Sequence, residues 1–471
     1  MSLFSKKKSK IEILTIYYLL IPNLLFIFTW TKSIFAFIIF LSIILPNLQL
    51  KTKILPLKVS YKNLLLILLA IVVPLLCGIG EWVNQVNDYN KHNIVFADLI
   101  TKDWVVEYIS KTNQQLYFFC YYVGYYLPTA FVAKYTDITA ARYISFIWGF
   151  CGIGLVFSWI LKVQNKTNVV YLLPFIFLGN LHIFIKFIDN SIDLYSFNYL
   201  INGLSWLPQT TTPLLLVFLI IYDQLINQAT LTKEILFILA LSFIWSPFAI
   251  MSIMVFLLFW LLRDGIKVFL SISNIIAGGC LTLLMFFYYT SHVKSDIPIG
   301  FILNFVPLSQ AAKYYSLYYA NLLLWIIPLL YLAPKVLKNS TQKIFFGLVI
   351  FFSCSIPMLY FGKENDLFIK SSFFYIYLGI TLISFYQQAP SFIKVYFIIL
   401  YLISLASPLR DMFYGIDKNN RIKVLSIEQT ANAGRDIFYT EQLYGNFGYV
   451  KQSLGDTSSF YYKHLAKLPT K

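Results

Sequence analysis

Long apolar runs separated by short polar segments make up most of this chain. A run of about 20 apolar residues is long enough to cross the hydrocarbon core of a bilayer as an α-helix. The pattern predicts spans near residues 11–30, 33–50, 63–80, 139–161, 168–183, 209–227, 234–247, 248–262, 266–289, 314–333, 343–361, 371–388 and 392–408. It therefore predicts an all-α polytopic membrane protein with about 13 transmembrane helices.

Two apolar segments do not fit a simple span. Residues 114–133 contain Gly124 and Pro128, and a full span there would move every later lysine-rich turn to the other side of the membrane. We expect a re-entrant or interfacial hairpin instead, with its broken backbone buried by protein. Residues 231–262 are too long for one helix, and the sequence WSP at 245–247 predicts two short helices.

Composition and charge support the membrane assignment. The chain has 471 residues, of which 59% are hydrophobic and 12% charged, and this excludes a soluble domain. The net charge of +16 does not predict nucleic-acid binding, because the lysines lie between apolar runs. All five cysteines lie inside apolar stretches, so neither a disulfide framework nor a metal cluster is indicated.

The lysines also predict the orientation of the chain in the membrane. Residues 1–10 and 51–62 are rich in lysine and are expected in the cytoplasm, by the positive-inside rule. The first apolar run has no small-residue cleavage site, so we expect a retained helix there. This orientation predicts that two segments lie outside the membrane. They are residues 81–113, which we call the outer loop, and residues 409–471, which we call the tail.

Three regions follow from this topology. Residues 1–62 form an N-terminal pair of transmembrane helices, and residues 63–408 form the transmembrane domain that carries the outer loop. The tail is too short for a large core of its own and contains a strand-like piece near 421–427. We expect it to fold as a small extracytoplasmic α+β cap.

The polar loops with chemically useful side chains all fall on the predicted outer face. The outer loop gathers Asp88, Lys91, His92 and Asp98 directly after an apolar run, and residues 362–370 add further charges. Carboxylates, a histidine and lysines at the end of a membrane helix are suited to polar chemistry on a lipid-linked substrate. The sequence has no Gly-rich phosphate loop and no metal-spaced histidine pair.

Four short elements carry a resemblance to a known class. They are Asp88 with Lys91-His92 and Asp98-Leu99, then WLPQTTTP at 206–213, WSPF at 245–248 and NDLFIKSS at 365–372. In these elements the chain resembles the GT-C class of polytopic glycosyltransferases, in particular a bacterial subgroup. The resemblance covers residues 80–390 and implies a multi-pass protein of the bacterial inner (plasma) membrane. It also implies sugar transfer from a polyprenyl-phosphate carrier to a glycan, lipid or protein acceptor.

The resemblance and the chemistry together suggest roles for seven residues. Asp88 is expected to be the general base, since a carboxylate near a low-dielectric boundary has a raised pKa. The remaining six are expected to contact substrate: Lys91, His92, Asp98, Gln209, Asp366 and Lys370. Among them Lys91, His92 and Lys370 would neutralise the departing phosphate. No metal-ligand set is visible, and the need for a divalent cation stays open.

Simpler structural roles compete with these assignments. Asp88 could cap a helix, and Asp98 fits a short amphipathic helix along the membrane. Asp366 and Lys370 are spaced i, i+4 and could pair only with each other. Gln209 could serve as a helix-start residue.

Two other functions are compatible with an outer-face site. A polymerase or ligase of polyprenyl-linked glycans usually has a large late loop with arginines, and this chain has few arginines there. A flippase for lipid-linked glycans predicts charged residues inside the spans and pseudo-symmetric halves, which the sequence does not show.

Overall fold

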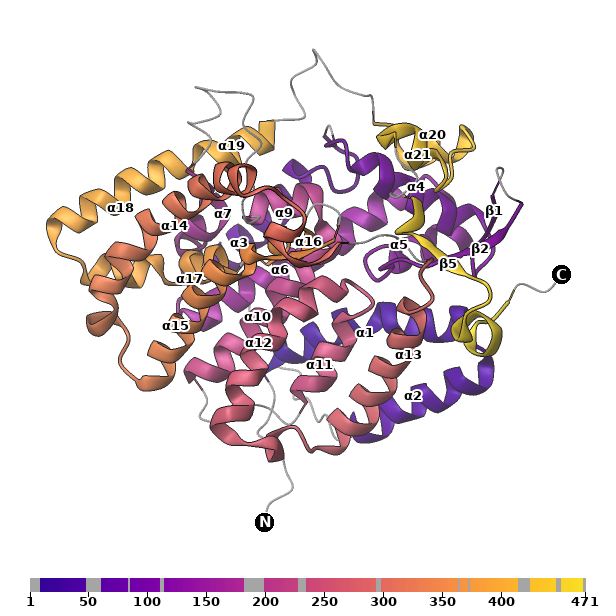
Figure 1. Cartoon of the computed structure of the whole chain (residues 1–471), viewed down its shortest axis with the longest axis horizontal. Helices are drawn as coiled ribbons and strands as arrows, with labels where there is room; N and C mark the ends of the chain where they lie inside the picture. Colours follow the sequence, from indigo (N-terminus) through magenta and orange to yellow (C-terminus); the bar gives the residue numbers. More distant parts are fainter. Residues whose placement is uncertain are drawn as a thin grey trace.

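A computed structural model describes most of the chain. The described residues are 9–47, 61–83, 85–110, 114–181, 199–227, 234–293, 298–362, 365–371, 373–413, 424–445 and 450–468. They form a mainly helical structure with two small antiparallel sheets (Figure 1).

Six helical segments in the described part are long and apolar enough to cross a membrane. They are Lys10–Trp30 (α1), Ala140–Val163 (α6), Leu308–Val336 (α14), Ser340–Met358 (α15 with a short 3-10 turn), Asp366–Gln388 (α16 and α17) and Ser391–Met412 (α18 and most of α19). Other apolar helices are Ser33–Asn47 (α2), Tyr61–Leu76 (α3), Pro208–Asn227 (α10), Pro247–Asp264 (α12) and Gly279–Tyr289 (α13), the last preceded by a π-helical stretch at Ser273–Gly278. The predicted mainly helical structure is therefore confirmed, and these six segments are consistent with a membrane protein; the total of 13 spans stays a prediction.

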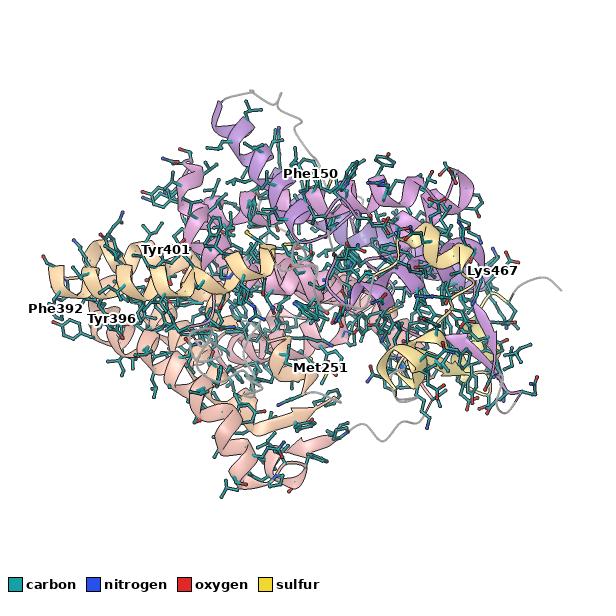
Figure 2. The ribbon with its side chains drawn as sticks, turned by 90° about the horizontal axis from the view of Figure 1, so that it is seen from above. Phe150, Met251, Phe392, Tyr396, Tyr401 and Lys467 are labelled. Atoms are coloured by element: carbon teal, nitrogen blue, oxygen red, sulfur yellow. The ribbon has the colours of Figure 1, made fainter. Side chains whose placement is uncertain are left out.

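Large apolar side chains are exposed on a helix at the edge of the molecule. Figure 2 shows Phe392, Tyr396 and Tyr401 along α18 (Ser391–Ser404) at the left edge, and Phe392 is 70% exposed. Such exposure of large apolar side chains suits contact with lipid and not with water.

Both predicted interruptions of the apolar pattern are present. Within 114–133 the structure has a strand and then the nine-residue helix α5 (Leu127–Tyr135), which is too short to cross a bilayer. Gly124 lies against Trp245, and its N–H donates to the Ile244 carbonyl, so protein does bury the broken backbone. The run around 245–247 is divided into α11 (Ile235–Ser242) and α12, as predicted.

One predicted span is not a single helix. Between 168 and 183 the structure has a 3-10 turn at Val169–Leu172 and the five-residue helix α7 (Leu173–Phe177). The chain becomes extended at Leu178, and Gly179 packs tightly against Pro408. Residues 182 and 183 lie outside the described part.

The tail packs directly on the outer loop. Strands β1 (Glu107–Ile109), β2 (Leu116–Phe119) and β5 (Leu454–Asp456) form one antiparallel sheet in the order β1-β2-β5. Helix α4 (Tyr89–Thr101) lies beside α20 (Ile427–Asn432), and the tail also contains α21 (Tyr439–Tyr444) and a short π-helix at Tyr461–Leu465. Figure 1 shows this yellow segment beside α4, β1 and β2.

These contacts place the tail and the outer loop at the same end of the molecule, and their location outside the membrane stays a prediction. The strand expected near 421–427 is not found where it can be assessed: Ile427 begins helix α20, and 421–423 lie outside the described part. The tail does contain both helices and a strand.

Several shorter elements complete the fold. They are α9 (Leu200–Trp206), β3 (Ile299–Phe301), a 3-10 turn at Ile302–Asn304, β4 (Leu359–Phe361), α16 (Asp366–Ile369) and α19 (Ala406–Phe413), with one further 3-10 turn at Ile266–Val268 elsewhere. Strands β3 and β4 pair antiparallel in the second sheet. The core between the helices is rich in fully buried aromatic side chains such as Trp245 and Tyr288.

Candidate functional site

Helix α4 brings three of the predicted site residues to one place. Asp88 directly precedes the helix, and its carbonyl accepts the backbone N–H groups of Lys91 and His92. The Asp88 side chain makes no capping hydrogen bond to α4, so the simple role of a helix cap is not observed. The carboxylate is half-buried, and it lies close enough to Lys91 and Tyr126 to interact with them electrostatically.

Two residues with left-handed backbone conformations, Gly362 and Asn365, precede the other predicted charges. Gly362 has φ +92°, and a Cβ atom there would lie 2.3 Å from a carboxylate oxygen of Asp366. Asn365 also has a left-handed backbone, with φ 52°, which asparagine tolerates better than most residues. The backbone at these two positions therefore favours glycine and asparagine, and α16 begins directly after Asn365 with Asp366.

Lys370 is held at the end of α16. Its ammonium donates to Asp366 at 2.7 Å, so the predicted i, i+4 pair is confirmed. The ammonium also lies 5.8 Å from the centre of the Tyr122 ring and 4.5 Å from the centre of the Phe248 ring. Only 5% of the Lys370 side chain is exposed, so this is a buried and paired cation.

The two segments meet at Lys91. Its ammonium interacts electrostatically with Asp88, Asp366 and Lys370, and we call these four residues the charged cluster. Burial and then the neighbouring Lys370 lower the pKa of Lys91 to about 8, although the two carboxylates oppose this shift. The sequence elements at 88–98 and 365–372 are thus brought together.

The Lys91 ammonium contacts an aromatic ring. It lies 4.5 Å from the centre of the Tyr121 ring, a cation–π distance. Among the residues that the structure describes, none accepts a hydrogen bond from it. A half-buried cation with a lowered pKa and no protein acceptor is stabilised when an anion binds beside it. The charged cluster is therefore suited to a phosphate group.

His92 is tied to protein groups through both ring nitrogens. Nε2 lies 3.0 Å from the Trp206 carbonyl, which can only accept, so Nε2 carries the hydrogen. Nδ1 must then accept from the Tyr126 hydroxyl at 2.6 Å. Burial lowers the pKa of His92 to about 4, so the ring is neutral near pH 7. These two hydrogen bonds show that His92 positions Tyr126 and joins α4 to the WLPQTTTP element, and its predicted contact with phosphate stays a prediction.

Asp98 lies about two turns further along α4 than Lys91 and contacts the tail. It is 2% exposed, accepts from the Tyr108 hydroxyl at 2.7 Å and from the Ile437 N–H at 3.1 Å, and pairs with Lys102 at 2.7 Å. Burial raises the pKa of this carboxyl, while Lys102 and Tyr108 oppose the shift. These contacts favour the structural role over contact with substrate.

Gln209 is the second residue of α10 and is fully buried. Neither its amide oxygen nor its amide nitrogen has a hydrogen-bond partner in the described part of the chain. No described contact joins it to the charged cluster. Its neighbour Thr210 donates to the Ser246 hydroxyl at 3.1 Å, which links the WLPQTTTP and WSPF elements.

The aromatic lining of the site was not predicted. Tyr121, Tyr122 and Tyr126 follow strand β2 and contact Lys91, Lys370 and His92 respectively. With 35 tyrosines in the chain, these three carry no distinguishing signal, except that they flank Gly124 in the predicted hairpin. In the described part, no group of three His, Cys, Asp or Glu residues could hold a metal ion.

The chain matches no protein-family model, no curated protein and no solved structure. The resemblance to the GT-C class therefore stays a prediction that rests on the four sequence elements.

Proposed function

We propose that this protein is a glycosyltransferase that moves a sugar from a polyprenyl-phosphate carrier to an envelope glycan, lipid or protein at the outer face of a bacterial plasma membrane. The charged cluster carries the proposal. Two carboxylates and two lysines from distant parts of the sequence lie together beside membrane helices, and Lys91 has no described acceptor. An anionic headgroup on an apolar chain matches that environment.

The cluster contains the groups that such a transfer needs. The acceptor hydroxyl attacks the anomeric carbon of the sugar while Asp88 accepts its proton. The bond between that carbon and the phosphate oxygen breaks, and the electron pair leaves with the phosphate. Lys91 supplies positive charge to the leaving phosphate, and Lys370, held by Asp366, supports it.

His92 and Asp98 support the reaction indirectly in this proposal. Because the Tyr126 hydroxyl donates to His92, its oxygen can only accept from any further partner, such as a sugar hydroxyl. Asp98 holds the tail against α4 and so keeps Asp88 and Lys91 in place.

The alternatives predict different features. A flippase needs charged groups along the transport path. The buried Asp223 near the end of α10 pairs with Lys162 at 2.8 Å, and Lys162 also donates a hydrogen bond to Ser9 before α1. These charges therefore link the ends of three helices. A polymerase or ligase of polyprenyl-linked glycans uses the same headgroup chemistry and differs in its product.

A transfer assay in membranes tests the proposal. With a polyprenyl-phosphate sugar as donor, Asp88→Asn should lower transfer by roughly 10²- to 10⁴-fold, since it removes the base and keeps the shape. Lys370→Ala should have a smaller effect. Asp103→Asn is the matched control, because Asp103 is an acid of the same loop with a side chain 86% exposed. Near-normal transfer by Asp88→Asn, or equal losses in all three variants, would refute the assigned role.

A further inference from the structure

Large apolar side chains are exposed around strands β3 and β4, at the lower edge of Figure 2. Six of them, each between 42% and 71% exposed, make up what we call the apolar patch: Ile299, Phe301, Leu303, Phe305, Leu308 and Leu359. Residues 298–312 and 355–361 contain no charged side chain. Such a dense group of exposed apolar side chains indicates a surface that is covered by a membrane or by another molecule.

The position of the apolar patch indicates that lipid covers it. Leu308 is the first residue of α14, and Leu359 directly follows the candidate span Ser340–Met358. Exposed apolar residues continue from the patch along α14, for example Leu323 and Leu330. A two-stranded sheet leaves backbone groups unpaired at its edges, which the hydrocarbon core does not tolerate. The patch therefore fits the interfacial zone, where aromatic side chains are favoured.

The apolar patch is connected to the charged cluster. The Gly362 N–H donates to the Pro298 carbonyl at 3.2 Å, which extends the β3–β4 pairing into the segment that carries Asp366. The ring of Phe361 contacts that of Phe248, with centroids 5.5 Å apart. Phe248 in turn lies 4.5 Å from the Lys370 ammonium. An apolar ligand chain that lies on the apolar patch would thus have one end beside the lysines of the charged cluster.

We propose that the apolar patch lies in the outer interface of the bilayer and forms the lateral entrance by which an isoprenoid carrier brings its phosphate to Lys91 and Lys370. The contact with lipid is independent of the proposed function, whereas the role as an entrance rests on it. An isoprenoid chain is apolar and its phosphate is anionic, so the two ends match the patch and the charged cluster in turn.

Spin-label accessibility tests the contact with lipid without measuring activity. Phe301→Cys would be labelled after alanine replaces the three less buried cysteines, Cys77 and Cys120 being buried. In vesicles of phosphatidylethanolamine and phosphatidylglycerol, the label should collide more with oxygen than with a water-soluble nickel chelate. Ile109→Cys is the matched control, because Ile109 is 64% exposed on strand β1 of the other sheet, and it should show the reverse. Greater collision with nickel at residue 301, or spin–spin broadening from a second copy, would overturn the proposal.

The proposed role of the apolar patch as an entrance is tested by how strongly the protein in nanodiscs retains two isoprenoid phosphates of different length. Phe301→Asp should lower retention of a C55 polyprenyl phosphate roughly tenfold and leave retention of the C10 citronellyl phosphate within about twofold, since only the long chain needs the apolar patch. Ile109→Asp should change neither. Unchanged retention of the C55 phosphate by Phe301→Asp would refute the entrance.

The same assay separates failure of the entrance from failure of the proposed function. Lys91→Ala should weaken both phosphates, because the charged headgroup is common to them. If Lys91→Ala retains both like the wild type, the phosphate site is wrong, whatever Phe301→Asp does.

Discussion

Replacing Lys91 with arginine should remove a pH dependence that the wild-type protein shows when it binds a polyprenyl phosphate. Burial and the neighbouring Lys370 lower the pKa of Lys91 to about 8, so this ammonium loses its proton at moderately alkaline pH. Arginine stays protonated throughout this range. Anion binding favours the charged form, so the affinity of the wild type should be high below the pKa and fall above it.

The size of the effect follows from the pKa of about 8. Roughly 90% of the Lys91 side chains are protonated at pH 7 and about 10% at pH 9. If only the charged form binds, the affinity falls about tenfold over this interval, which corresponds to about 1.4 kcal/mol. A bound phosphate raises the pKa of Lys91 in the complex. The pH dependence of the affinity is still set by the fraction of the free protein in which Lys91 is protonated.

The assay is retention of radiolabelled C55 polyprenyl phosphate in nanodiscs between pH 6.5 and 9.5, pH values chosen to bracket the pKa of about 8. The ionisation of the phosphate itself is common to both proteins, so the difference between wild type and Lys91→Arg isolates Lys91. Thermal unfolding at each pH checks that both remain folded. Parallel pH curves for the two proteins would refute the assignment of Lys91 as the phosphate-binding cation.

Two further substitutions test how the site is held. Gly362→Ala should destabilise the protein by about 1–3 kcal/mol and reduce phosphate retention, since the new methyl group collides with Asp366 at a residue with positive φ. Gly347→Ala is the control in thermal unfolding, because a Cβ atom there meets no atom within 4 Å. Equal stability of the two variants would contradict the role of Gly362. Asp98→Asn should cost about 1.5–3 kcal/mol and make the tail more sensitive to protease, because it weakens charged hydrogen bonds to Tyr108 and to the tail backbone. An unchanged cleavage rate of the tail would show that Asp98 does not hold it.

Local rules predicted the elements whose structure depends on neighbouring residues. The first apolar run gave α1 close to its observed bounds, and proline at 247 ended one short helix and began another. The pairing of Asp366 with Lys370 follows from helical spacing alone. The hairpin at 114–133 followed from glycine, proline and the side on which the lysines lie.

Contacts between distant segments could not be predicted in the same way. The pairing of β2 with β5 joins residues near 117 to residues near 455, and nothing in either segment specifies the other. The hydrogen bonds of His92 to Tyr126 and Trp206 depend on how three helices pack. The role of Gly362 is visible only once the Asp366 carboxylate occupies the space of its missing side chain.

The fate of the carrier in sealed proteoliposomes tests the central claim most directly. Purified wild-type protein, supplied with a polyprenyl-phosphate sugar and membrane acceptors, should release one polyprenyl phosphate for each sugar that appears on an acceptor, and Asp88→Asn should release almost none. If the lipid-linked sugar instead crosses the bilayer with its sugar–phosphate bond intact, or if the leaving lipid is a diphosphate, the protein is a transporter or a ligase and the account given for the charged cluster is wrong.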